Sequence, residues 1–190
     1  MDSLRFNPIT EWRGPGFNWH YLGFNRMLHE ISREFESIPN PNFKMLEIGS
    51  YMGESTSMFA SSGIFNEIHC IDPFNGYEEA NDFLKKEWSE ISEEFKINTR
   101  HFNNITVHCD YSYNISNRFE DNYFDLIYID AAHDYESIKR DIELYLPKCK
   151  RIMAGHDYCP EWPGVIQSVN EILGKPDFIF SDSSWLKKIK

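Results

Sequence analysis

The feature that most constrains this fold is a repeated alternation of short apolar segments with amphipathic ones. Short apolar runs predict strands, whereas apolar residues every three or four positions predict helices. Strands that alternate with helices form a parallel sheet covered on both faces. The predicted strands are Lys44–Ile48, Glu67–Ile71, Ile105–Cys109, Phe124–Ile129 and Arg151–Ala154. The predicted helices are Trp19–Ile38, Glu54–Ala60, Glu78–Ile97, Tyr111–Phe119, Tyr135–Leu146 and Val165–Leu173.

The C-terminal segment departs from this alternation. The runs Asp177–Phe180 and Trp185–Ile189 flank a short polar stretch, which predicts an antiparallel hairpin. The expected fold class is therefore α/β, a doubly wound and mostly parallel sheet with a C-terminal antiparallel hairpin. The length of 190 residues fits one domain. Within it we expect an N-terminal loop and helix over residues 1–42 and a Rossmann-like core over residues 43–190.

A turn bracketed by glycines follows the first predicted strand. Gly49 and Gly53 enclose Ser50, and Ser55 stands at the start of the next helix. Glycines at such a turn permit positive φ and let a ligand approach the backbone closely. The spacing is neither G-x-G-x-x-G nor a P-loop, so it does not favour those two kinds of site. From the glycines alone, a purely structural turn remains an alternative.

Carboxylates stand at the ends of successive predicted strands. Glu47 lies near the end of the first strand, Asp72 follows the second and Asp110 follows the third. A carboxylate at the tip of the second strand can accept hydrogen bonds from ribose hydroxyls, and the third could meet an adenine amino group. Each of them alone could instead be a helix cap. Together they predict a nucleoside-like ligand at the carboxyl edge of the sheet.

Three segments resemble the class I S-adenosylmethionine-dependent methyltransferases. The segment LEIGSYMGEST is similar to their E/D-x-G-x-x-x-G motif. The segments FDLIYIDAAHDYESIKRDIELYLP and IMAGHDY resemble the methyltransferase family 24 branch, which includes sugar O-methyltransferases. The resemblance runs from about Phe43 to Lys190 and implies a seven-stranded sheet with S-adenosylmethionine as cofactor. The resemblance and the strand-end carboxylates together give the set of residues expected to bind the cofactor. They are Glu47, Gly49, Ser50, Gly53, Ser55, Asp72, Asp110 and Asp130.

Acidic and histidine residues follow the fourth and fifth predicted strands. Asp130 ends the fourth strand, with His133 three residues later. His156 and Asp157 end the fifth strand, and neighbouring strand ends face one crevice in a doubly wound sheet. Carboxylates suit Mg²⁺, and an imidazole can serve as a general base near neutral pH. The alternatives are a strand-end cap for Asp130, a surface position for His133 and a structural hydrogen bond for His156.

The resemblance assigns roles to the same residues. It implies that Asp130 is a metal ligand and that His133 is the catalytic base. It aligns His156 and Asp157 with the two further metal ligands. His156 departs from the pattern of the metal-dependent relatives, which carry Asp-Asp or Asp-Asn at this pair. A neutral imidazole favours softer metals than Mg²⁺.

Together with these residues, the resemblance implies an O-methyltransferase that acts on a hydroxyl of a sugar or other small molecule, or on a glycan end. The expected cofactors are S-adenosylmethionine and Mg²⁺ or another divalent metal. One alternative is a small-molecule N-methyltransferase that needs no metal. Another is a non-catalytic module that binds S-adenosylmethionine, although the intact acidic and histidine residues argue against it.

Charge and hydropathy argue against other classes of partner. The chain has 19 basic and 30 acidic residues, a net charge of −11, which is opposite in sign to a nucleic-acid-binding surface. Neither a long apolar run nor a basic-then-apolar leader occurs, so no membrane association is expected. Four cysteines without a C-x-x-C pair predict reduced thiols and a cytoplasmic location.

Overall fold

The computed structural model describes residues 17–36, 38–39, 41–75 and 88–189. Its helices are α1 (Phe17–Phe35), α2 (Glu54–Ser61), α4 (Trp88–Thr99), α5 (Ser112–Ile115), α6 (Tyr135–Tyr145) and α7 (Pro163–Leu173). Its strands are β1 (Lys44–Ile48), β2 (Glu67–Ile71), β3 (Ile105–His108), β4 (Phe124–Ile129), β5 (Cys149–Gly155), β6 (Phe178–Ile179) and β7 (Trp185–Lys188). The described residues thus hold most of the predicted elements. The expected N-terminal loop lies outside them over residues 1–16, as does part of the predicted helix Glu78–Ile97, over residues 78–87.

The strands form one seven-stranded sheet in the order β3-β2-β1-β4-β5-β7-β6. The first five strands are parallel, and β7 runs antiparallel to both β5 and β6. The predicted fold class, with its C-terminal antiparallel hairpin, is confirmed. At one edge of the sheet Ile48 pairs with Ile71 and with Ile129, and Ile129 pairs with Gly155. The carboxyl ends of β1, β2, β4 and β5 are therefore level with one another.

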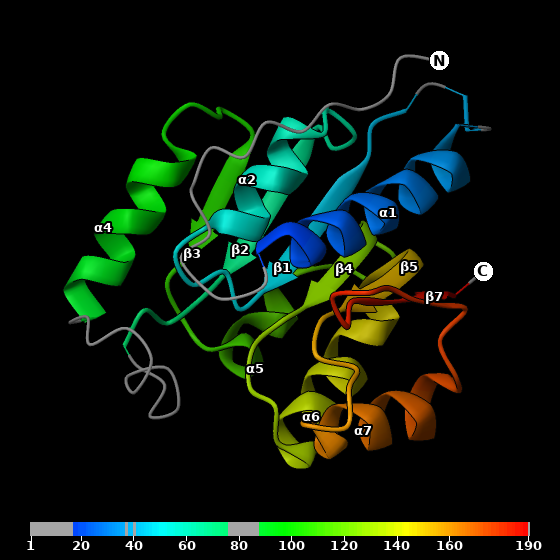
Figure 1. Ribbon diagram of the computed structural model, residues 1–190. Helices are drawn as coiled ribbons and strands as arrows, with labels where there is room; N and C mark the ends of the chain where they lie inside the picture. Colours follow the sequence, from blue (N-terminus) through cyan, green and yellow to red (C-terminus); the bar gives the residue numbers. More distant parts are fainter. Residues whose placement is uncertain (1–16, 37, 40, 76–87, 190) are drawn as a thin grey trace.

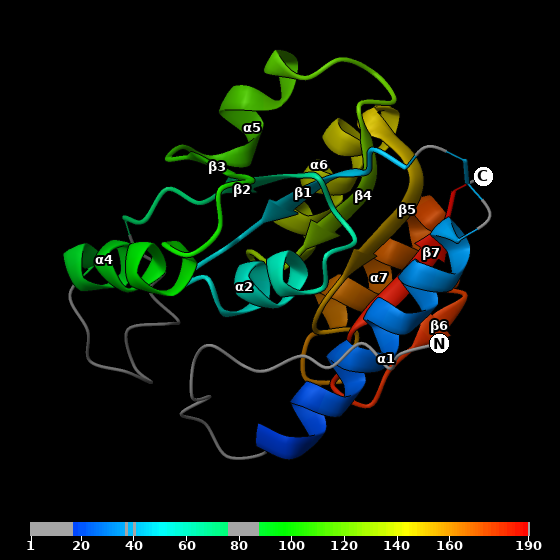
Figure 2. The same ribbon diagram turned by 90° about the horizontal axis from the view of Figure 1, so that it is seen from above.

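Helices cover both faces of this sheet, as Figures 1 and 2 show. Helices α1, α2 and α4 lie on one face, whereas α5, α6 and α7 lie on the other. Consecutive residues of a strand point to opposite faces of the sheet and belong to two separate hydrophobic cores. Met45 packs toward α1, whereas Leu46 packs toward α6. Because both faces are covered, β4 is buried at every position from Phe124 to Ile129.

The boundaries of several elements differ from the sequence prediction. Helix α1 ends at Phe35 rather than Ile38, because a residue that precedes a proline, here Pro39, disfavours helical backbone. Strand β5 begins at Cys149, two residues before the predicted start, because a 3-10 turn leads directly into it. The predicted helix Tyr111–Phe119 is divided into α5 and a further 3-10 turn.

The apolar character of the helices and the state of the cysteines bear on where the protein can reside. Among the described residues, no helix combines the length and the apolar character that a membrane crossing needs. The four cysteines are free thiols, and two of them, Cys70 and Cys149, are buried. The cytoplasmic location and the one-domain organisation stay predictions.

The placement of β7 inside the sheet predicts a large effect of truncating its buried side chains. Leu186 on β7 is 1% exposed, so Leu186→Ala should lower the free energy of unfolding by roughly 2–5 kcal/mol, the usual cost of such a core cavity. Ile179 on the neighbouring strand β6 is 48% exposed, so Ile179→Ala is the matched control and should change it by less than about 0.5 kcal/mol. Urea denaturation measures both, and equal effects would contradict the burial of Leu186 in the sheet.

Candidate active site

The candidate site lies where the order of the strands reverses. Strand β1 lies between β2 and β4, so the chain leaves β1 toward α2 on one face and leaves β4 toward α6 on the other. In open α/β sheets, ligands bind in the crevice outside the carboxyl ends of strands at such a point. The predicted site residues follow these strand ends.

The glycine turn between β1 and α2 packs tightly against the end of β4. Gly49 has a φ of 86° and Gly53 a φ of 79°, which are left-handed values that favour glycine. The Gly49 N–H donates to the Ile71 carbonyl at 2.9 Å. A Cβ at Gly49 would lie 2.0 Å from the Asp130 carbonyl oxygen. Any side chain at Gly49 would therefore push against protein backbone, which explains this glycine without a ligand.

Glu47 supports the turn from within the core. Its side chain is fully buried and accepts hydrogen bonds from the hydroxyls of Ser55, at 2.5 Å, and Thr56. Ser50 is also buried. Burial raises the pKa of the Glu47 carboxyl to about 7, although the hydroxyl hydrogen bonds favour its ionised form. Glu47 and Ser55 thus fix the shape of the turn, and direct contacts of either with a cofactor stay predictions.

The raised pKa of Glu47 predicts a pH dependence of stability. Because the folded value is about 7 and the ordinary value is 4.5, Glu47 stabilises the fold below pH 4.5 and loses this contribution as pH rises through 7. The loss should reach about 3 kcal/mol, since one pKa unit corresponds to ~1.4 kcal/mol. Glu47→Gln should remove this part of the dependence. Urea denaturation at several pH values between 4.5 and 8 measures it, and parallel pH curves for the two proteins would contradict the assignment.

Asp72, at the end of β2, holds two unusual backbone conformations. One carboxylate oxygen accepts the Tyr51 N–H and the other accepts the Phe74 N–H, both at 2.8 Å. Tyr51 has a φ of 44° and Phe74 a φ of 48°, which non-glycine residues rarely adopt. Burial raises the pKa of Asp72, while these backbone hydrogen bonds oppose the shift. Asp72 therefore ties the glycine turn to the β2 end, where the predicted ribose contact would lie.

Asp110 follows β3 and is involved in local contacts. Its Oδ1 accepts the Tyr111 N–H and the Asn114 side-chain amide, both at 2.8 Å. The Asn114 hydrogen bond, with the Tyr111 N–H, lowers the pKa of this carboxyl. They do not cap a helix, because the N-cap position of α5 is Tyr111 and no side chain caps it. The predicted adenine contact stays a prediction.

The second half of the site brings Asp130, His156 and Asp157 together. Each offers one ligand atom, and these atoms all lie within 4.8 Å of one another. Among the described residues, this is the one such group of three or more metal-ligating side chains. Asp157 has a φ of 60°, a strained value that turns the chain sharply after β5. Two carboxylates and an imidazole form a donor set that fits a divalent metal.

Two histidines hold the Asp157 carboxylate. His133 Nε2 lies 2.8 Å from Asp157 Oδ2, and His156 Nδ1 lies 3.1 Å from Asp157 Oδ1. The rings of His133 and Trp162 stack with centroids 4.2 Å apart. His133 therefore lies in the cluster rather than on the open surface. Asp134 caps α6 by accepting the Ser137 N–H at 2.9 Å.

The charges in this cluster shift its pKa values strongly. Burial opposes protonation of His156, but the hydrogen bond to Asp157 and the charge of Asp130 outweigh it and raise the pKa to about 9. Burial raises the pKa of Asp130 to about 6, partly offset by His156. The hydrogen bonds from His133 and His156 lower the pKa of Asp157 despite its burial. Such opposed shifts are frequent at functional sites.

Sequence reasoning missed Asp182, in the turn between β6 and β7. This residue is 1% exposed and accepts the Ser184 hydroxyl at 2.8 Å. Its negative charge raises the pKa values of both Asp130 and His156. The turn is joined to the cluster because the Tyr158 N–H donates to the Ser183 carbonyl at 3.0 Å. The only signal in the sequence was an acidic residue in a predicted hairpin turn, which is common in turns of any function.

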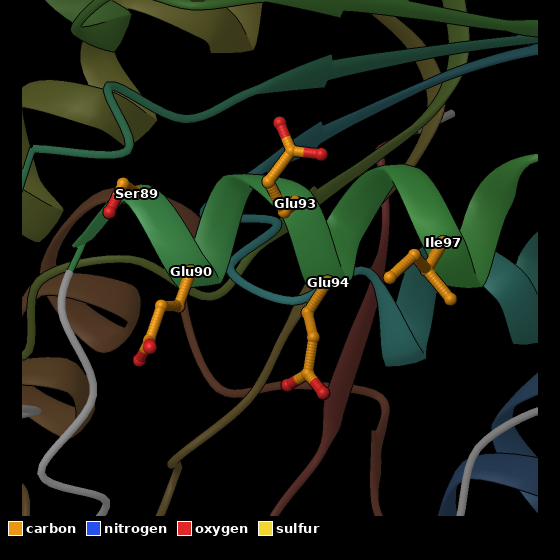
Figure 3. Close-up of a pocket in the computed structure, with 5 residues that line it drawn as sticks. All are labelled: Ser89, Glu90, Glu93, Glu94 and Ile97. Carbon is orange, nitrogen blue, oxygen red and sulfur yellow. The ribbon is translucent and has the colours of Figure 1, made fainter.

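A surface pocket lies elsewhere, along α4. Figure 3 shows its described lining, which comes from one helix and is largely acidic: Ser89, Glu90, Glu93, Glu94 and Ile97. Helix α4 itself contacts the glycine turn, because the Asn98 side-chain amide donates to the Met52 carbonyl at 2.9 Å. The metal-ligating cluster does not line it.

The family follows from comparison with known proteins. A family model described as a methyltransferase domain, the family 24 branch that the sequence resembles, matches residues 46–158, more than half of the chain. The chain belongs to this methyltransferase family. It is an S-adenosylmethionine-dependent methyltransferase, as predicted. No curated protein sequence matches this methyltransferase significantly.

Solved structures share the fold of this methyltransferase at low sequence identity. The calicheamicin methyltransferase CalS11 is 17% identical with a TM-score of 0.60, covering 86% of this chain and 77% of its own. A putative caffeoyl-CoA O-methyltransferase from Staphylococcus aureus is 18% identical with a TM-score of 0.59, covering 87% and 83%. Cofactor-bound Rv0187 from MTB is 13% identical with a TM-score of 0.59, covering 95% and 83%. At this identity the likeness establishes the fold.

The arrangement at the glycine turn predicts a loss of cofactor affinity in an Asp72 variant. Asp72→Ala should weaken binding of S-adenosylhomocysteine more than tenfold, because charge-assisted hydrogen bonds contribute roughly 1.5–3 kcal/mol. The control is Asp121→Ala, which removes an exposed carboxylate whose contact is Lys148 at 3.4 Å. Titration calorimetry measures both affinities. Unchanged affinity in a folded Asp72→Ala protein would exclude the ribose role.

Proposed function

We propose that this methyltransferase transfers a methyl group to a hydroxyl of a sugar or other small molecule, or to the end of a glycan, with help from a divalent metal. The observation that carries the proposal is the grouping of Asp130, His156 and Asp157 with His133 beside the glycine turn. A hydroxyl is a weak nucleophile until its proton is removed, so O-methylation benefits from both a base and a cation.

Two similar structures support an oxygen acceptor. One structure of CalS11 is described as a TDP-rhamnose 3'-O-methyltransferase, and another similar structure as a putative caffeoyl-CoA O-methyltransferase. Both descriptions name small-molecule acceptors. The negative net charge of −11 argues against a nucleic acid as the acceptor, because it would repel the long row of phosphates in a nucleic-acid backbone.

The metal would be held by Asp130, His156 and Asp157. When bound, it supplies a positive charge that lowers the pKa of a coordinated hydroxyl. Asp130 serves both halves of the site, because its backbone packs on Gly49 while its side chain belongs to the metal-ligating group. The acceptor hydroxyl would thereby be kept near the cofactor, and alignment of two reactants is a large part of catalysis.

His133 would act as the general base. Asp157 lies 2.8 Å from its Nε2 and fixes the orientation of the ring, as a carboxylate does for other catalytic histidines. Trp162 stacks on the ring and limits its rotation. A base fixed in this way can take the acceptor proton as the methyl group is transferred.

The proposal predicts two distinct losses of activity. His133→Ala should lower turnover by roughly 10²–10⁴-fold, the usual contribution of a general base, with little change in cofactor affinity. EDTA should abolish activity of the unchanged protein, and excess divalent metal should restore it. The assay follows labelled methyl from S-adenosylmethionine to TDP-rhamnose and to caffeoyl-CoA as probe acceptors, and calorimetry with S-adenosylhomocysteine checks the cofactor site.

Other outcomes of the same assay separate the alternatives. Full activity in EDTA would exclude the metal role and leave His133 as a base without a metal. Transfer to amine acceptors alone, insensitive to EDTA, would identify an N-methyltransferase. Binding of S-adenosylhomocysteine with no transfer to hydroxyl or amine probes would favour the non-catalytic module.

A further inference from the structure

We propose that the Asp130–His156–Asp157 site binds a first-row transition metal ion such as Co²⁺ or Mn²⁺ in preference to Mg²⁺. This inference rests on the proposed function, because it concerns the identity of the metal in the same site. It follows from the donor types, which are two carboxylates and one imidazole within 4.8 Å of one another.

The imidazole is the decisive donor. Mg²⁺ is a hard cation that takes oxygen ligands and releases its waters reluctantly, so replacing an oxygen donor with nitrogen weakens its binding. Transition metals accept imidazole readily, and their affinity for mixed nitrogen and oxygen sites rises from Mn²⁺ to Co²⁺ and beyond. The carboxylates of Asp130 and Asp157 alone would suit either class of metal.

The structure fixes His156 as part of the cluster. Its backbone N–H donates to the Ile129 carbonyl at 3.2 Å, which anchors it to the end of β4. Its Nδ1 lies 3.1 Å from Asp157 Oδ1, so the imidazole and this carboxylate are held side by side. The backbone at Asp157, with a φ of 60°, turns the chain so that both side chains reach the same group.

The surrounding charge favours a cation at this point. Asp130 and Asp157 supply two carboxylates to the group, and the buried Asp182 lies in the turn whose Ser183 carbonyl accepts the Tyr158 N–H, next to Asp157. Asp182 is outside the metal-ligating group, so it adds negative charge without adding an oxygen ligand. Charge therefore strengthens binding of any divalent ion, whereas the choice among ions depends on His156.

The test compares metals directly by titration calorimetry on the full chain, which needs no acceptor. The unchanged protein should bind Co²⁺ at least about tenfold more tightly than Mg²⁺, and Asp130→Asn should remove this binding. His156→Asp supplies an oxygen donor, so it should reduce the ratio of Co²⁺ to Mg²⁺ affinity by about tenfold or more. His156→Asn, which is uncharged, should also reduce it and serves if the first variant does not fold. His29→Asp makes the same change at an exposed position on α1 and should leave the ratio unaltered.

The outcomes separate this inference from the proposed function. An equal ratio of affinities in the unchanged protein and both His156 variants would overturn the inference, while metal binding that depends on Asp130 would still support the proposed function. Absence of any binding that depends on Asp130 would overturn both the inference and the metal-assisted part of the proposed function. A ratio that falls only in the His156 variants would support the inference.

Discussion

The site depends on the close contact between the glycine turn and the end of β4. Gly49 lies against the Asp130 carbonyl so tightly that no Cβ fits, and the Asp130 N–H donates to the Ile48 carbonyl at 2.8 Å. This contact exists because β1 and β4 are neighbours at the point where the strand order reverses. It joins the turn expected to receive the cofactor to the residue that begins the acidic and histidine cluster. A shift of either strand would separate the two halves of the site.

Several carboxylates that are buried or half-buried lie around this contact, and each is stabilised in a different way. Glu47 receives hydroxyl hydrogen bonds from α2, and Asp72 receives two backbone N–H groups. Asp157 is held by two histidines, whereas Asp182 is bound within its own turn. Burial of a carboxylate is costly unless such partners are present.

The elements that were predicted well are those whose own residues form a clear apolar pattern. The run Phe124–Ile129 is apolar at nearly every position, and the structure has the same boundaries for β4. Element ends were predicted less well, as at Phe35 and Cys149, because they depend on neighbouring turns rather than on hydrophobic period. The seven-stranded count and the antiparallel hairpin were available from the sequence because the final two apolar runs lack an intervening helix.

The sequence by itself determined the α/β class, the family and the carboxylates and histidines that follow the strands, since these are properties of local pattern and motif. It placed Asp130, His133, His156 and Asp157 near one edge because parallel strands end on the same side. Only the tertiary structure decided which atoms meet. The stacking of Trp162 on His133 and the charge of Asp182 near His156 join segments that are distant in the chain. Those contacts depend on the packing of loops after β5 and between β6 and β7, and such packing leaves no periodic signal in a single sequence.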